Sequence, residues 1–462
     1  MSELAIPRAQ EKSASASEWR ALIAIALPVV VVQVGLMLMG VVDTLIIGHL
    51  SPEALAAVAL GNLYFWNGIV IAMGALMALD PLVAQAVGAN DQVAITRSIQ
   101  GGLILSLLLG ALTMVVMIPA APLLRAFRQP PEVIPSAATY IHISAAGVIP
   151  FLVFVVLRQS LQAIGRLAPI VWTIIAANVL NAALNWVLIF GHLGAPRLGV
   201  AGSAIATLVS RLAMCGMLLV IAWTELRPHL GTLDRASLAR EPLWGMLGLG
   251  LPIGLQQFLE FSAFGAVGLL MGTFGALPVA AHQIALNLAA LTFMVPLGVG
   301  AAAAVRVGHA VGAGDGPRSH RAARIAYVLG AGFMTTTAAM FLMLPRPLAA
   351  LYSKVDPLVA IAASLIPIAG VFQIFDGLQA VGAGVLRGFG DTRVPLIAML
   401  LGYWLIGVPV SVVLGFKTGM GPQGLWWGFV AGLASVAIFL AVRVRVIFRR
   451  AVSRVRVDTT RS

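Results

Sequence analysis

Two stretches of the chain carry nearly the same sequence, half a chain length apart. Residues 86–91 read Ala-Val-Gly-Ala-Asn-Asp, residues 310–315 read Ala-Val-Gly-Ala-Gly-Asp, and Asp315 follows Asp91 by 224 positions. The same offset relates Leu27-Pro28 to Leu251-Pro252. A chain that is duplicated in this way and hydrophobic almost throughout is typical of a membrane transporter built from two similar helical bundles.

The composition places the chain in a lipid bilayer. Of its 462 residues, 60% are hydrophobic and 10% are charged, whereas soluble domains carry about 25% charged residues. Twelve apolar runs have about the 20 residues that are needed to cross a hydrocarbon core of about 30 Å. The runs are continuous, which excludes the alternating pattern of a β-barrel. The predicted spans are 21–47, 57–80, 99–120, 138–162, 168–191, 200–223, 244–271, 279–303, 325–345, 358–384, 395–415 and 422–447.

The spans predict an all-α membrane protein with two bundles of six helices. The chain then divides into an N-terminal segment (1–20), an N-lobe (21–223), a charged linker (224–243), a C-lobe (244–447) and a basic tail (448–462). Each half has an even number of spans, so both halves begin on the same side of the membrane. The repeat is therefore parallel, with a pseudo-twofold axis along the membrane normal.

The net charge of +12 is distributed unevenly over the two sides of the membrane. One set of alternate loops carries six basic residues, Arg211 lies inside a span, and the other 22 of the 29 Lys and Arg lie on the opposite side or in the tail. This asymmetry follows the positive-inside rule and predicts that both termini are cytoplasmic. The tail is expected to contact anionic lipid or to be solvated, and nucleic acid is not an expected partner. The six loop residues are Arg125, Arg128, Arg197, Arg346, Lys354 and Lys417.

Three acidic residues lie within apolar spans: Asp43, Glu260 and Asp376. A charge at the centre of a membrane helix costs at least about 2.5–3.5 kcal/mol on insertion scales, so each acid requires a physical reason. One interpretation is structural, with a protonated carboxyl hydrogen-bonded to a neighbouring helix or a carboxylate paired with an arginine. The other is functional: such a group can take up H+ or Na+ and release it on the other side of the membrane.

Neutral polar residues occur in pairs at helical spacing. Asn181 and Asn185 are four residues apart, as are Ser203 and Thr207, so each pair shares one helix face. Together with Asp43 they could form an all-oxygen site for a monovalent cation. Gln283 and Asn287 form a similar pair that we expect beside Glu260. The alternative for each pair is hydrogen bonding between helices.

Other motifs with a known chemistry are missing from the sequence. There is no Gly-x-x-x-x-Gly-Lys-Ser/Thr loop for ATP, no His-Glu-x-x-His motif, and one cysteine only, so neither an enzyme nor a bound cofactor is expected. Arg158, Arg306 and Arg387 lie near predicted helix ends. We expect their side chains to snorkel toward the membrane surface.

Several motifs, in order, resemble the multidrug and toxic compound extrusion (MATE) family in its bacterial NorM-like branch. They are Leu27-Pro28, Val42-Asp43-Thr44, Ala281-His282-Gln283-Ile284-Ala285-Leu286-Asn287, Val305-Arg306-Val307-Gly308 and Leu386-Arg387-Gly388-Phe389-Gly390-Asp391-Thr392. The resemblance covers about residues 21–445. It implies a V-shaped antiporter of twelve helices that expels organic cations in exchange for H+ or Na+.

The resemblance also assigns roles to particular residues. Asp43 matches the acid of a cation site in the N-lobe, and Asn181, Asn185 and Thr207 match its polar neighbours. Glu260 and Asp376 match the acids of the C-lobe. Four residues before that Asp, some relatives carry Tyr where this chain has Phe372. The loss of that hydroxyl removes a possible Na+ ligand and favours H+ as the coupling ion.

The resulting hypothesis is a secondary active efflux antiporter of the inner membrane, functional as a monomer. Its substrates would be lipophilic, mainly cationic organic compounds that leave from a cavity between the lobes, and H+ or Na+ would be the only cofactor. Possible Na+ sites are the Asp43 group and the pair of Glu260 and Asp376. The alternative is a lipid-linked precursor flippase of the same superfamily, which would be expected to line its cavity with arginines rather than acids.

Overall fold

The computed structural model describes residues 8–231, 234, 237, 239–449 and 453–455, and this part of the chain contains helices but no strand. Residues 1–7 of the predicted N-terminal segment and the tail arginines Arg450, Arg456 and Arg461 lie outside the described residues. The helices of the first half are α1 (Arg8–Gly48), α2 (Pro52–Leu76), α3 (Leu79–Gly88), α4 (Gln92–Met117), α5 (Ala120–Ala126), α6 (Ile134–Ala145), α7 (Val148–Ile164), α8 (Ala168–Phe190), the short η1 (His192–Gly194), α9 (Val200–Ile221) and α10 (Trp223–Leu230).

The second half begins with long, nearly uninterrupted helices and includes a span of mixed helical type before its last helix. Its elements are α11 (Arg240–Gly272), α12 (Ala276–Gly312), α13 (Gly316–Met343), α14 (Pro345–Ala350), α15 (Asp356–Gly388), α16 (Arg393–Met399), η3 (Leu400–Gly407), α17 (Val408–Val412), η4 (Val413–Lys417) and α18 (Pro422–Phe448). The elements η3 and η4 are π-helical, and α16, η3, α17 and η4 together form one continuous span.

The described part of the chain contains up to twelve candidate membrane spans. Eleven helical segments are long and apolar enough to cross a membrane, and α6 and α7, which meet at a bend of 48°, form the twelfth. The predicted all-α class and number of spans are therefore confirmed. The predicted bounds were too short in places: α12 has 37 residues, whereas the apolar run covers 279–303. The last turns of α12 lie past the apolar run and are buried against α3, where Gly308 faces Ala84 and Gly312 faces Gln85.

The chain forms two compact units. Unit 1 contains α1 as far as Val30, residues 84–90 of α3, and the chain from Leu255 to Val455. Unit 2 contains the chain from Val31 to Val83 and from Asp91 to Gly254. Helices α1 and α11 therefore each begin in one unit and continue in the other. Each of these two helices passes from one unit to the other at an equivalent position of the repeat, two residues after Pro28 in α1 and two residues after Pro252 in α11.

The duplication is visible in the local backbone. Asp91 and Asp315 cap the starts of α4 and α13 with nearly the same geometry, at φ −95° and −93°, and each accepts a hydrogen bond from the backbone N–H three residues later. Gly165 and Gly390 follow α7 and α15 in the left-handed conformation, at φ 88° and 78°. These are the preferred residues for helix starts and ends. The repeated sequence motifs thus encode the same turns twice.

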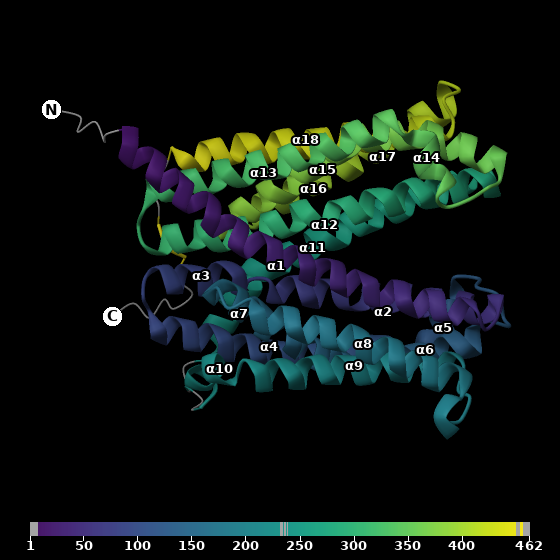
Figure 1. The fold of residues 1–462 in the computed structure, drawn as a ribbon, viewed down its shortest axis with the longest axis horizontal. Helices are drawn as coiled ribbons and strands as arrows, with labels where there is room; N and C mark the ends of the chain where they lie inside the picture. Colours follow the sequence, from purple (N-terminus) through teal and green to yellow (C-terminus); the bar gives the residue numbers. More distant parts are fainter. Residues whose placement is uncertain (1–7, 232–233, 235–236, 238, 450–452, 456–462) are drawn as a thin grey trace. The chain divides into compact units, whose positions relative to one another are not determined.

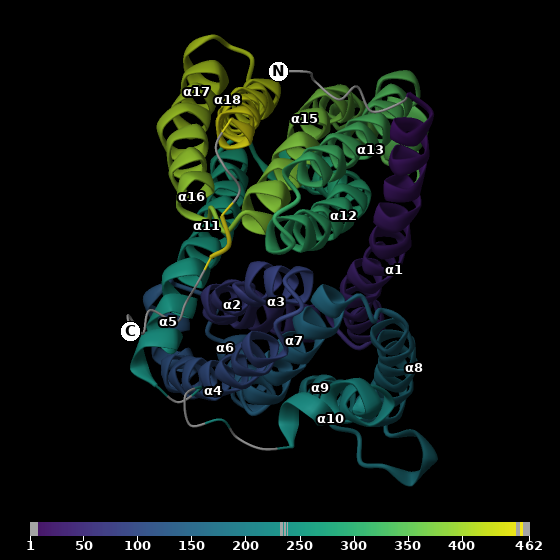
Figure 2. The ribbon, with the colours of Figure 1, turned by 90° about the vertical axis from the view of Figure 1, so that its left-hand side faces the viewer.

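Small residues bring the helices of each unit into close contact. In unit 1, α15 packs against α12, α13 and α18, which run side by side in Figure 1. In unit 2, α9 packs against α8, α6 and α7, and α8 lies next to α9 in Figure 2. At Gly384, an added Cβ would overlap the backbone carbonyl of Gly300 on α12. Such contacts between small residues are the usual way in which membrane helices associate.

Gly250 provides a test of this packing within unit 2. A Cβ at Gly250 on α11 would overlap the carbonyl oxygen of Ala75 on α2, whereas a Cβ at Gly248 would have no atom within 4 Å. We expect Gly250→Ala to lower the free energy of unfolding by about 1–3 kcal/mol, the range for overpacking. Gly248→Ala is the matched control and should leave stability unchanged or slightly raised. Thermal unfolding in detergent measures both, and equal midpoints would show that α2 and α11 do not meet here.

Two of the three arginines expected to snorkel are buried instead. Arg306 on α12 makes a bidentate ion pair with Glu18 on α1, with Nε to Oε1 at 2.8 Å and Nη2 to Oε2 at 2.7 Å. The Arg306 and Glu18 side chains are 13% and 7% exposed. Arg158 on α7 is 8% exposed and donates to Gln33 Oε1 at 3.1 Å. The snorkelling interpretation is wrong for both residues, because long-range partners on α1 occupy the position that we assigned to solvent.

The described residues of the predicted linker belong to unit 2 and contact Gln100 and Arg97 on α4. Gln100 on α4 donates to the carbonyl of His229 at 2.9 Å. The side-chain oxygen of Gln100, Oε1, accepts hydrogen bonds from the Asp234 backbone N–H at 2.9 Å and from the Ser237 hydroxyl at 3.0 Å. The His229 imidazole lies 2.8 Å from Thr96 Oγ1 through its Nδ1 atom, and burial lowers its pKa. The linker is therefore held by hydrogen bonds to Gln100 and by an ion pair between Asp234 and Arg97 at 2.7 Å.

The start and the end of the described chain lie at the same end of unit 1. Val455 donates its backbone N–H to Gln85 Oε1 at 2.8 Å, and Gln85 donates to the carbonyl of Gly388, the last residue of α15, at 2.9 Å. The Glu18 ion pair lies near the last turns of α12, which pack against this end of α15. The beginning of α1 and the tail are thus on one side of the unit.

Candidate functional site

Asp43 lies in the middle of a polar cluster in unit 2. Its side chain is buried, and Asn185 on α8 donates to Oδ1 at 2.7 Å while Thr207 on α9 donates to Oδ2 at 3.0 Å. Both carboxylate oxygens thus accept a hydrogen bond from a different helix. Three helices converge on this carboxylate, as the spacing of the polar residues predicted. We call Asp43, Asn181, Asn185 and Thr207 the Asp43 cluster.

The Asp43 cluster contains oxygen atoms with unused hydrogen-bonding capacity. Asn181 and Asn185 are both fully buried, yet within the described chain no partner reaches either side-chain oxygen of the two amides. The Asn181 side chain faces Asp43, but its nitrogen also lacks a partner at hydrogen-bonding distance there. Ser203, one turn before Thr207, has a buried hydroxyl that also lacks a hydrogen-bond partner within the described chain. Buried polar atoms are rarely left unpaired, so these atoms are candidates for contact with a transported or coupling species.

Arg211 brings a positive charge to this cluster, one turn after Thr207 on α9. It is 6% exposed, its guanidinium lies 3.8 Å from the centre of the Phe65 ring, and it makes a long hydrogen bond of 3.5 Å to the Ser144 carbonyl. It is close enough to Asp43 to interact electrostatically. Sequence reasoning noted Arg211 inside a span but gave it no role. The Asp43 cluster therefore combines one carboxylate with one fixed cation.

The second acidic group lies in unit 1 and has no fixed cation. Asp376 on α15 is 5% exposed, Glu260 on α11 is partly exposed, and the two carboxyl groups interact electrostatically. Neither forms an ion pair with any residue that the structure describes, and Asp376 Oδ1 has no hydrogen-bond partner in that part of the chain. We call Glu260 and Asp376 the acidic pair. The structure brings these two residues together, as expected.

Two residues that sequence reasoning missed surround Glu260. Gln379 Nε2 on α15 donates to Glu260 Oε1 at 2.9 Å. The hydroxyl of Tyr403, on η3, lies 3.3 Å from the same oxygen and 3.1 Å from Gln379 Oε1. Gln379 follows Asp376 by three residues on one helix, so helical spacing could have identified it. No spacing relates Tyr403 to α11 or α15.

Phe372 lies in an aromatic cluster rather than at a polar position. Its side chain is 1% exposed, and its ring centre lies 5.6 Å from that of Trp426 and 5.9 Å from those of Phe264 and Phe429. The hydroxyl that some relatives would place here is absent, and a hydroxyl reaches Glu260 from Tyr403 on another helix.

Gln283 and Asn287 bond to each other. Gln283 Nε2 donates to Asn287 Oδ1 at 3.1 Å on an exposed face of α12. This hydrogen bond satisfies one donor and one acceptor of the pair. The hydrogen bonds to Glu260 come from Gln379 and Tyr403.

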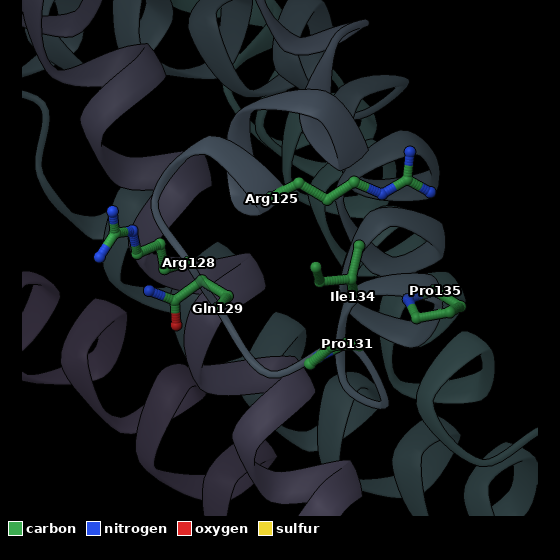
Figure 3. Close-up of a pocket in the computed structure, with 6 residues that line it drawn as sticks. All are labelled: Arg125, Arg128, Gln129, Pro131, Ile134 and Pro135. Atoms are coloured by element: carbon green, nitrogen blue, oxygen red, sulfur yellow. The ribbon is translucent and has the colours of Figure 1, made fainter.

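A surface pocket lies away from these residues. It has a volume of about 520 Å³ and is lined by Arg125, Arg128, Gln129, Pro131, Ile134 and Pro135, between α5 and the start of α6. Figure 3 shows the Arg125 and Arg128 side chains extending in opposite directions. They do not converge on one point, so this pocket is not the candidate site.

Several proteins of known name resemble this chain over almost its whole length. It is 39% identical to a probable multidrug resistance protein NorM of Rhizobium meliloti over 451 residues, 96% of either chain. It is 38% identical to the multidrug resistance protein PmpM of Pseudomonas aeruginosa, over 93% of this chain and 91% of that one.

Solved structures of MATE transporters share the fold. The eukaryotic MATE transporter AtDTX14 superposes with a TM-score of 0.85 at 23% identity, covering 94% of this chain and 96% of that one. An outward-facing multidrug resistance MATE family transporter of the MOP superfamily also gives 0.85, at 24% identity over 94% and 97% of the chains. The MatE family model matches residues 28–187 and 252–413, one copy in each half of the sequence. The chain therefore belongs to the MATE family, in its NorM-like branch, and is a transporter rather than an enzyme.

Proposed function

We propose that this protein is a secondary active multidrug efflux antiporter of the inner membrane, which exports lipophilic, mainly cationic organic compounds in exchange for H+. The observation that carries the proposal is the acidic pair, two adjoining carboxyl groups without a cationic side chain. Two like charges in a poorly solvated position repel each other, and a proton or a bound cation removes that repulsion. The relatives named for multidrug resistance support the substrate class.

Exchange follows if the coupling ion and the substrate use the same negative charge. A protonated acidic pair has little attraction for an organic cation, and a deprotonated pair has a strong one. Uptake of H+ from outside would then release the substrate, and loss of H+ to the inside would prepare the pair for the next substrate. A ligand shifts a conformational equilibrium only through different affinities for the two states, and the change of charge supplies such a difference.

The neighbours of the acids favour H+ over Na+. A sodium ion needs several oxygen ligands around one point, and the Asp43 cluster has such oxygens, but Arg211 adds a positive charge that opposes a second fixed cation. Beside the acidic pair, Phe372 supplies no ligand. A proton needs only a carboxyl group and a hydrogen-bond partner, which both groups offer.

The proposed orientation places both termini in the cytoplasm. An even number of spans brings them to one side, and the start of α1 and the tail lie at the same end of unit 1. The excess of Lys and Arg on that side supports a cytoplasmic location for it. The N-lobe (21–223) and C-lobe (244–447) remain predicted domain boundaries, with membrane lipid as a partner of the basic tail.

The experiment that tests coupling uses the purified protein in liposomes with a fluorescent organic cation such as ethidium. We expect an imposed pH gradient alone to drive transport of the dye, and an added Na+ gradient to change the rate little. Liposomes with the Glu260→Gln variant are the control for leakage of the dye. Transport that requires Na+ and ignores the pH gradient would reverse the assignment of the ion. Transport of a lipid-linked pyrophosphate instead of the dye would favour a flippase.

A further inference from the structure

The inference concerns how Glu260 is held in two charge states, and it rests on the proposed H+ exchange. A carboxylate only accepts hydrogen bonds, whereas a protonated carboxyl group must also donate one. A group that carries protons through the transport cycle needs partners for both forms, because a buried polar atom without a partner costs free energy. Gln379 and Tyr403, which both contact Glu260, can provide partners for both forms.

The Tyr403 hydroxyl has one proton and two acceptors. It lies 3.3 Å from Glu260 Oε1 and 3.1 Å from Gln379 Oε1, and it can donate to only one of them at a time. Gln379 donates to Glu260 Oε1 through its Nε2 atom at 2.9 Å. The three side chains therefore form a closed triangle of polar atoms in which the direction of the hydroxyl proton is free.

We infer that Tyr403 and Gln379 are positioning residues that stabilise both charge states of Glu260 by turning the Tyr403 hydroxyl. When Glu260 is a carboxylate, Tyr403 and Gln379 both donate to it. When Glu260 takes a proton from solution, its O–H donates to the Tyr403 oxygen, and Tyr403 turns to donate to Gln379 Oε1. The phenol keeps its own proton throughout, so the only net change is the one proton on Glu260.

The backbone around Tyr403 holds the hydroxyl in this place. Tyr403 lies in the π-helical element η3, and π-helical turns occur frequently at functional sites. The next residue, Trp404, donates its Nε1–H to the carbonyl of Leu259, the neighbour of Glu260, at 3.1 Å. A Cβ at Gly407 would lie 3.2 Å from the Cα of Gly432 on α18, so the other side of η3 is closely packed. Two consecutive side chains of η3 are thereby directed at α11.

Other titratable groups near Glu260 are few within the described chain. Asp376 on α15 and Tyr403 itself interact with it electrostatically. His282 Nε2 on α12 would lie 3.8 Å from a Cβ at Gly268, two turns further along α11 than Glu260. A change in pH dependence on altering Tyr403 can therefore be assigned to the acidic pair.

Tyr403→Phe tests the inference in the liposome assay. The variant keeps the ring but removes the hydroxyl from both states, and hydrogen bonds to charged groups are stronger than those to neutral groups. The carboxylate form of Glu260 therefore loses more stabilisation than the protonated form. We expect the pH dependence of dye exchange to shift upward by about 0.5–1 pH unit. Gln379→Leu removes the other hydrogen-bond donor to Glu260 and should shift the pH dependence in the same direction. The two variants therefore keep the test valid if one of them does not fold.

Tyr327→Phe is the matched control. Its hydroxyl is buried and has no hydrogen-bond partner among the described residues, so the same chemical change breaks no contact there. We expect its pH profile to equal that of the parent. If Tyr403→Phe and Gln379→Leu lower transport equally at every pH, both residues are structural and the inference is wrong. If the parent protein itself shows no transport driven by pH, the proposed H+ exchange fails first, and this inference with it.

Discussion

Replacement of Glu260 by Gln is expected to reduce dye export driven by a pH gradient to the level of liposomes without protein. The change keeps the size of the side chain and its capacity to hydrogen-bond to Gln379 and Tyr403, but it removes the proton that the site exchanges. Asp43→Asn should have the same effect on export, because the amide keeps the volume but not the charge that faces Arg211. Ethidium transport in liposomes measures both variants.

The control for these variants is the same substitution at an exposed position. Asp356, in the first turn of α15, is exposed, and Asp356→Asn should transport at the parental rate. All three variants should elute as folded protein in size-exclusion chromatography. Parental export by both Glu260→Gln and Asp43→Asn would make the carboxyl groups structural and the antiport mechanism wrong.

The second large effect is expected on stability, at the ion pair of Glu18 and Arg306. Loss of one partner from a buried ion pair costs about 3–5 kcal/mol, and the more distant and more exposed Arg318 would compensate the Glu18 charge only in part. Arg306→Gln should therefore lower the thermal unfolding midpoint strongly. Arg318 lies 3.6 Å from the same carboxylate but is 35% exposed, and an exposed ion pair contributes only about 0–1 kcal/mol. Arg318→Gln is thus the matched control and should change the midpoint little.

A double variant separates the pair from its surroundings. Glu18→Gln combined with Arg306→Gln removes both charges, and we expect the loss of stability to be smaller than the sum of the two single losses. Additive losses would mean that the two side chains act independently, in contradiction to the bidentate contact between them.

The sequence predicted the number and the order of the spans because each apolar run is long and separated by polar turns. It also predicted that the Asp43 cluster could converge, since Asn181 and Asn185 share one helix face and Ser203 and Thr207 share another. Helical spacing relates residues within one helix, and the apolar flanks of Asp43 marked it as a functional position. Local information was sufficient for both conclusions.

The missed features depend on contacts between distant segments. Tyr403 reaches Glu260 across 143 positions, and Arg306 reaches Glu18 across 288. Neither contact leaves a spacing in the sequence, so Arg306 was assigned to solvent and Tyr403 was not considered. Gln283 and Asn287 share one face and bond to each other, and a shared face does not determine which neighbour that face meets.

The division of α1 between the two units has a consequence for how the protein is made. Glu18 enters the membrane with the first helix, but Arg306 leaves the ribosome only after another 288 residues have been synthesised, which takes about 15–60 s at about 5–20 residues per second. During this time Glu18 in the first turns of α1 has no Arg306 to pair with, and its carboxylate is solvated by water near the membrane surface. The first helix to be inserted is therefore among the last to complete its packing.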